Sequence, residues 1–94
     1  MTSSIRDLAQ KYNVRVHRKV EKFIQNEIRE PPRKEEARLF INDLPNYPFL
    51  QERWDVDKIE GRESMYRVRI GRYRIYYLVD SVTREIKVIE AKLK

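Results

Sequence analysis

Three arginines in the C-terminal half of the chain have the residue type and the spacing needed to bind phosphate together. Arg67 and Arg69 are separated by one residue, and Arg74 follows shortly after Gly71. Alternate residues of a β-strand point to the same face, so Arg67 shares a face with Arg69, and Arg74 shares a face of the next strand with Tyr76. If Gly71 closes a hairpin in the usual register, we expect the guanidinium groups to converge on one face.

Guanidinium groups that converge in this way could cleave a phosphodiester without a metal ion. Each one offers planar, paired N–H donors that match phosphate oxygens, and their charge stabilises a pentacoordinate transition state. Tyr76 could stack a nucleobase beside them. Lys58, Lys92 and Lys94 could extend the basic surface, although each lysine alone is typical of an ordinary exposed residue.

The same arginine pattern also has a purely structural interpretation. Arginines that alternate with apolar residues are common on the solvated side of a half-buried sheet. Like charges on neighbouring strands repel one another, however, and the segment 66–79 contains no acidic residue that would offset them. The pattern alone therefore leaves both interpretations open.

The composition excludes several kinds of chemistry and favours an anionic partner. The 94 residues carry a net charge of +6, no cysteine and a single histidine. This excludes disulfides, cysteine nucleophiles and thiolate metal sites, and one histidine cannot supply the usual metal cluster. A positive field attracts nucleic acid first and acidic proteins second. We therefore expect a protein without metal or cofactor that binds RNA or an acidic protein.

The length and the N-terminal segment predict one cytoplasmic domain. A chain of 94 residues suffices for a single core, so we expect one domain over 1–94, with 1–12 as an N-terminal extension. Residues 1–12 lack the apolar centre of a secretion signal, and no run of about eighteen apolar residues could span a bilayer. We expect no membrane partner.

The spacing of apolar residues predicts a strand and two helices in the first half of the chain. Alternation at 14–16 is typical of a short strand. Apolar residues at spacings of three and four predict a helix over about 18–29, which the proline pair at 31–32 ends. A second helix follows these prolines up to Pro45, and the two helices form a hairpin.

The second half of the chain predicts three strands. Residues 46–57 contain bulky aromatic side chains and are expected to form an irregular, packed segment. Alternation over 65–70 and 73–79 predicts two strands that Gly71 joins, and 86–93 predicts a last strand. The order β-α-α-β-β-β predicts an α+β fold, in which an antiparallel sheet carries the helical hairpin on one face.

The chain resembles the RelE toxins of the RelE/ParE superfamily, and the archaeal-like RelE branch in particular. The resemblance covers about 13–94 and lies chiefly in KIEG at 58–61, YRVRIGRYRIYYLVD at 66–80 and the final strand IKVIEAKLK. It implies a toxin of a type II toxin–antitoxin system that cleaves messenger RNA on the ribosome by attack of the 2′-hydroxyl on the adjacent phosphate. It also implies a cognate acidic antitoxin, with which the toxin could form a heterotetramer.

The resemblance assigns roles to several basic residues. The family's basic pair falls on Arg67 and Arg69, the arginine of its YR motif on Arg74, and a basic residue after the last strand near Lys94. Two departures concern proton transfer: well-studied members have lysines at the first two positions, and many have a C-terminal tyrosine as general base. Arginine stays charged and accepts protons poorly.

The general base and the function each have alternatives. For the general base, Tyr76, Glu90 or no residue of this chain remain open. For the function, the ParE branch has the same fold but poisons DNA gyrase and typically lacks the three basic residues. A catalytically silent module that binds RNA or antitoxin is the other alternative. The presence of all three arginines favours the RNA-cleaving branch.

Overall fold

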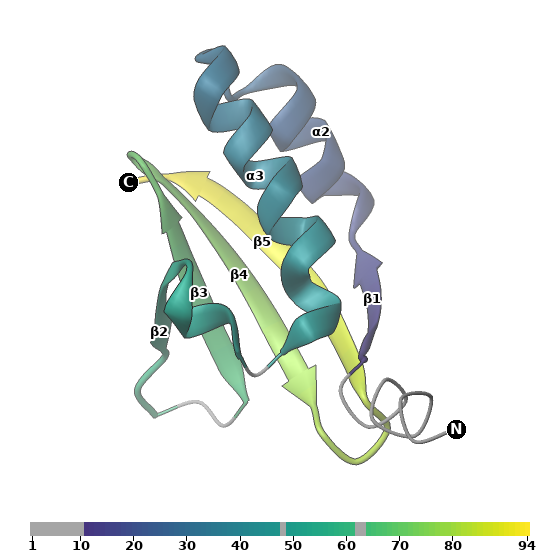
Figure 1. Cartoon of the computed structure of the whole chain (residues 1–94). Coiled ribbons are helices and arrows are strands. Elements are labelled where there is room, and N and C mark those ends of the chain that lie inside the picture. The colour runs from purple at the N-terminus through teal and green to yellow at the C-terminus, as the bar shows by residue number, and fades with distance from the viewer. Residues whose placement is uncertain (1–10, 48, 62–63) are drawn as a thin grey trace, which may run out of the picture.

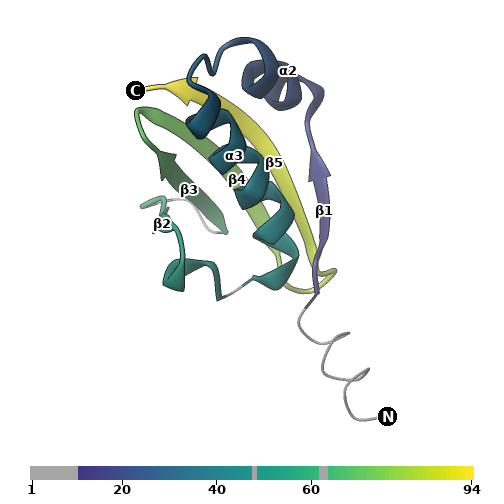
Figure 2. The same cartoon turned by 45° about the horizontal axis from the view of Figure 1, so that its top comes forward.

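The computed structural model describes residues 11–47, 49–61 and 64–94, which form a twisted sheet with a helical hairpin on one face (Figure 1). The elements are β1 (Asn13–Val16), α2 (Arg18–Asn26), α3 (Pro31–Asp43), β2 (Asp55–Lys58), β3 (Met65–Ile70), β4 (Tyr73–Asp80) and β5 (Glu85–Leu93). The sheet has five strands in the order β1-β5-β4-β3-β2. Figure 2 shows both helices over the same face of the sheet, which leaves the other face uncovered.

The expected α+β class and the helical hairpin are confirmed, but the sheet differs in two respects. β2 begins within the segment 46–57, which we expected to be irregular, ends at Lys58 and pairs antiparallel with β3. β1 pairs with β5 in parallel, so the sheet is mixed rather than antiparallel. The helices α2 and α3 bring the chain back to the end of the sheet at which β1 starts. β1 can therefore run in the same direction as β5.

The two helices begin and end where local chemistry allows. His17 caps α2, since its Nδ1 accepts a hydrogen bond from the Lys19 N–H at 3.0 Å. α2 ends at Asn26, three residues before the predicted end at 29, and Ile28 is still buried in the link. Pro31 opens α3, where its missing N–H leaves no helical hydrogen bond unmade.

A single core fills the space between the helices and the sheet. The buried apolar residues are Val20, Ile24, Ile28, Ala37, Phe40, Leu44, Leu50, Val68, Ile70, Tyr73, Ile75, Tyr77, Val79, Ile86 and Val88. Phe40 lies at the centre of an aromatic group, with ring centroids 5.3 Å from Trp54 and 5.6 Å from Tyr77. The sheet therefore presents apolar alternate residues to the helices, as the alternation in sequence predicts.

The segment between α3 and β2 is fixed by its aromatic residues. Trp54 donates a hydrogen bond to Asp43 at 2.9 Å, and the hydroxyl groups of Tyr47 and Tyr66 lie 3.1 Å apart. Partial burial alone would raise the pKa of the Asp43 carboxyl, but hydrogen bonds from Trp54 and Asn46 outweigh it, so the pKa lies below its usual range. This packing sets the position from which β2 starts.

The predicted N-terminal extension 1–12 lies outside the described residues over its first ten positions. Tyr12 is described and packs against the domain: its N–H donates to the Pro45 carbonyl at 3.0 Å, and its ring meets Tyr47 edge-on at 5.2 Å. None of the helices within the described part of the chain is long and apolar enough to cross a membrane.

Candidate functional site

The β3–β4 hairpin brings the three arginines together on the uncovered face of the sheet. Arg69 lies directly opposite Arg74, and Arg67 lies opposite Tyr76. The turn contains two residues, and its first, Gly71, has φ +62°, a left-handed conformation that glycine adopts at little cost. The register therefore places the guanidinium groups as the sequence predicts.

We call this uncovered surface the arginine face. Two rows of residues cross it from β2 to β5: Asp57, Arg67, Tyr76 and Glu90 in one, and Asp55, Arg69, Arg74 and Lys92 in the other. The alternate residues of β3 and β4 are buried beneath the helices. The face thus holds four cationic side chains and three carboxylates within two adjacent rows.

A β-bulge in β5 places Glu90 and Lys92, the last members of these rows, on the arginine face. Tyr77 pairs with Val88 and Tyr76 with Glu90, so Ile89 is the extra residue. An extra residue reverses the alternation beyond it. Without the bulge, Glu90 would point to the helices with Val88. With it, Glu90 and then Lys92 point to the arginine face.

The structure places the other two predicted RNA-binding lysines, Lys58 and Lys94, at different points of the fold. Lys58 pairs with Tyr66, whose ring stacks on buried Tyr77 at 5.6 Å, so Lys58 starts from the helix-covered face. Its strand parity thus differs from that of Arg67 and Arg69, and the binding of RNA by the exposed Lys58 stays a prediction. Lys94 is exposed just beyond β5, where its N–H donates to the Arg72 carbonyl at 2.9 Å beside the hairpin turn.

A fourth nearby arginine, Arg72, pairs with Glu30 at the start of α3. Its guanidinium lies 3.3 Å from the Glu30 carboxylate, and the Tyr73 hydroxyl donates to the same carboxylate at 2.5 Å. The hydrogen bond from Tyr73, with the charge of Arg72, holds the pKa of Glu30 below its usual range. These contacts fasten the hairpin turn to the start of α3.

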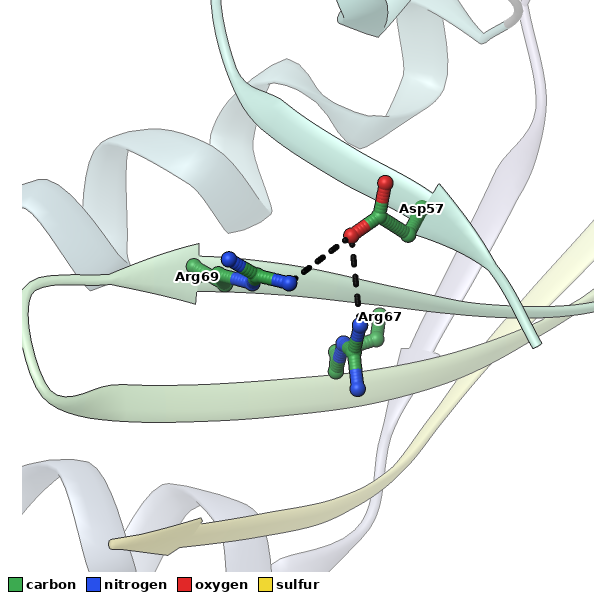
Figure 3. A network of polar contacts seen from close by, with 3 residues as sticks. All are labelled: Asp57, Arg67 and Arg69. Atoms are coloured by element: carbon green, nitrogen blue, oxygen red, sulfur yellow. Dashed lines mark hydrogen bonds and ion pairs between the residues drawn. The ribbon is translucent and has the colours of Figure 1, made fainter. Parts of the chain in front are cut away.

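Asp57 is the residue of the site that the sequence analysis missed. Its Oδ2 accepts from Arg67 Nη2 at 3.2 Å and from Arg69 Nη2 at 3.4 Å, as Figure 3 shows. The segment 66–79 itself contains no acidic residue, and the carboxylate that pairs with the arginines comes from the neighbouring strand β2. The only signal in the sequence is the alternation of DVDK at 55–58, and four residues are too few to establish a strand period.

A hollow with a volume of about 410 Å³ includes Tyr76, Glu90 and Lys92 of the arginine face. It is lined by Lys19, Ile59, Met65, Tyr76, Ile89, Glu90 and Lys92. The Lys92 ammonium lies 5.3 Å from the centre of the Tyr76 ring, and Lys19 lies 2.7 Å from Glu90. The lining combines apolar side chains with charged ones, which suits a nucleobase next to a phosphate.

The two residues considered as general bases differ in their surroundings. The hydrogen bond from Lys19 lowers the pKa of Glu90, so Glu90 is an ionised but weakly basic carboxylate. Tyr76 is half-buried and lies opposite Arg67. Over the described ranges, no group of histidine, aspartate and glutamate side chains could hold a metal ion. The chemistry of this face is therefore that of guanidinium, ammonium, phenol and carboxylate groups.

Comparisons with known proteins agree with this architecture. No protein-family model matches the chain. It is 32% identical over 69 residues to RelE1 of Methanocaldococcus jannaschii, a protein named as a RelE toxin, and the match covers 73% of this chain and 74% of that protein.

Solved structures extend the similarity over most of the domain. The RelE chain of the RelE–RelB complex from Pyrococcus horikoshii superposes with a TM-score of 0.73 at 30% identity, covering 88% of this chain and 94% of that chain. A mutant of the Escherichia coli toxin RelE in the free state shares the fold, with a TM-score of 0.66 at 15% identity over 88% of this chain and 83% of that one. The chain therefore belongs to the RelE toxin family and is of the archaeal RelE-like type.

Proposed function

We propose that this protein is the toxin of a type II toxin–antitoxin system and cleaves messenger RNA on the ribosome without a metal ion. The observation that carries the proposal is the convergence of Arg67, Arg69 and Arg74 on a sheet face that the helices leave open. Membership of the RelE family supports the proposed role as a toxin. The arginine cluster supports the proposal that the substrate is a phosphodiester.

The proposed reaction is a transfer within the RNA strand. The 2′-oxygen forms a bond to the adjacent phosphorus and loses its proton, while the bond from phosphorus to the 5′-oxygen breaks and that oxygen takes up a proton. Arg67, Arg69 and Arg74 bind the phosphate and stabilise its added negative charge. The ribosome orients the RNA strand, which supplies the alignment that an open sheet face cannot supply alone.

Proton transfer requires a group other than arginine, since guanidinium stays charged. Of the two side chains beside the arginines, we propose Tyr76 as the acceptor: its phenolate form would take the proton and is a stronger base than the Glu90 carboxylate, whose pKa the hydrogen bond from Lys19 lowers further. Tyr76 also forms part of the hollow that could receive a base. One residue could thus stack the base and take the proton.

We expect Tyr76→Ala to weaken the binding of single-stranded RNA about tenfold, because stacking of a base on an aromatic ring contributes about 1–3 kcal/mol. Tyr76→Phe keeps the ring and should bind as the wild type does. Fluorescence anisotropy with a labelled oligonucleotide measures both. If Tyr76→Phe binds normally but no longer cleaves, the hydroxyl carries the proton. Unchanged binding by Tyr76→Ala would remove the ring from the site.

The function itself can be tested by induced expression of the protein in growing cells. The proposal predicts rapid arrest of translation with cleaved messages, mapped by sequencing of RNA ends. Poisoning of DNA gyrase, as in the ParE branch, would instead give DNA damage with intact messages. A catalytically silent binding module would leave growth unaffected. Either of the last two results would contradict the proposal.

A cognate acidic antitoxin is the proposed partner. The solved relatives from P. horikoshii and Methanococcus jannaschii are complexes of RelE with RelB. The present chain has a net charge of +6 and an uncovered basic face. An acidic, amphipathic segment that folds across this face would neutralise the arginines that engage RNA, and pairing of two such complexes would give a heterotetramer.

A further inference from the structure

The free protein already holds an anion between two of its arginines. The Asp57 Oδ2 atom lies 3.2 Å from Arg67 Nη2 and 3.4 Å from Arg69 Nη2, and the two guanidinium groups approach it from different sides (Figure 3). A single carboxylate oxygen shared by two guanidinium groups imitates one oxygen of a phosphodiester, which accepts hydrogen bonds from the same donors.

Asp57 offsets the repulsion between arginines on the uncovered face of the sheet. Arg67, Arg69 and Arg74 lie on adjacent strands, where like charges repel. The Asp57 carboxylate offsets two of them, whereas Arg74 makes no ion pair within the described part of the chain. Without RNA, Asp57 therefore reduces the repulsion between Arg67 and Arg69, and the charge of Arg74 remains available to an incoming anion.

The contacts of Asp57 with Arg67 and Arg69 are weak enough for another anion to replace them. Charge-assisted hydrogen bonds usually measure about 2.7–2.9 Å, and both contacts of Asp57 are longer. The side chains of Asp57 and Arg69 are each 45% exposed, so water competes with the pair. β2 is held by its pairing with β3 through the backbone, so the carboxylate can turn away while the strand remains in place.

We infer that Asp57 Oδ2 marks the phosphate position of the arginine face, and that an RNA phosphate must displace Asp57 to bind there. This inference rests on the proposed function. It makes Asp57 an affinity-determining residue: it competes with the substrate for Arg67 and Arg69. Arg67 is the more enclosed of the two, with its side chain 20% exposed and its Nε buried without a partner among the described residues, so it stays in place when the anion exchanges.

The test compares Asp57→Asn with a matched variant on the same strand. Asp55 shares the face with Asp57 and lies opposite Arg69, but makes no ion pair within the described ranges. Asp55→Asn therefore changes the net charge equally and leaves the Asp57 contact intact. The probe is a short RNA with 2′-O-methyl groups, which binds but cannot be cleaved. Its Kd is measured by anisotropy at fixed low salt.

We expect Asp57→Asn to bind this RNA about fivefold more tightly than the wild type, since exposed ion pairs are weak and their loss frees both arginines. Asp55→Asn should gain less than about twofold, through net charge alone. Asp57→Ser serves as a second variant without the amide, and thermal unfolding checks that each variant is folded.

Each outcome decides the inference. An equal gain for Asp57→Asn and Asp55→Asn would reduce the effect to net charge and overturn it. Weaker binding by Asp57→Asn would also overturn it, because Asp57 would then support the arginines in the bound state. A gain seen with inorganic phosphate but not with RNA would assign the position to a free anion. Failure of the wild type to bind RNA at all would instead defeat the proposed function, and the inference with it.

Discussion

Replacing Arg74 with alanine should lower the rate of RNA cleavage about 100-fold and abolish toxicity, while the fold remains intact. Arg74 lies opposite Arg69 and, within the described residues, has no carboxylate to offset it. Its charge is therefore available to the phosphate, and one such contact in a transition state contributes about 3 kcal/mol. Replacing an arginine at the sheet surface usually changes the free energy of unfolding by no more than about 0.5 kcal/mol. Induced expression, with cleavage sites mapped on messages, measures the first effect, and thermal unfolding measures the second.

Two further variants make the Arg74 result specific. Arg38→Ala removes the same charge from an exposed position of α3, on the other side of the sheet, and should leave toxicity unchanged. Arg74→Lys keeps the charge but loses the planar pair of donors, so it should retain part of the activity. If Arg74→Ala is as toxic as the wild type, Arg74 does not belong to the site.

Phe40→Ala should destabilise the protein by about 3–5 kcal/mol, the usual cost of removing a buried phenyl ring. Phe40 is fully buried and contacts both Trp54 and Tyr77, so its loss leaves a cavity between the helices and the sheet. In a domain of this size the Tm should fall by roughly 15–30 °C. Trp54 is the single tryptophan of the chain, so its fluorescence reports the unfolding directly.

The neighbouring residue provides the control for this prediction. Leu39 is 49% exposed on the same helix, and Leu39→Ala should change the free energy of unfolding by less than about 1 kcal/mol. A similar loss in both variants would mean that helix propensity, rather than the core, dominates the stability of α3. A small loss for Phe40→Ala would place the main core elsewhere.

The part of the site that alternation controls could be predicted from the sequence. Arg67, Arg69 and Arg74 fall on one face because the apolar residues between them are drawn to the core, and Gly71 fixes the register of a two-residue turn. These are local effects, and they need no knowledge of which strands become neighbours. The helical hairpin followed from the proline pair at 31–32 for the same reason.

The parts that depend on contacts between distant segments could not be predicted. The four residues of β2 are too few for a clear period, so the sequence did not show the face of Lys58, and Asp57 was missed as the partner of Arg67 and Arg69. The parallel direction of β1 depends on where the helical hairpin returns the chain. The bulge at Ile89 is visible only as a register shift between paired strands.

The two outer strands of the sheet also affect whether two copies of the protein can pair edge to edge. β1 and β2 are the edge strands, and each has only four residues. Short edges expose few unpaired backbone groups, and three of the four residues of β2 are charged. Edges of this kind resist pairing with a second copy. The basic face can therefore stay open to a partner without the sheet becoming a template for aggregation.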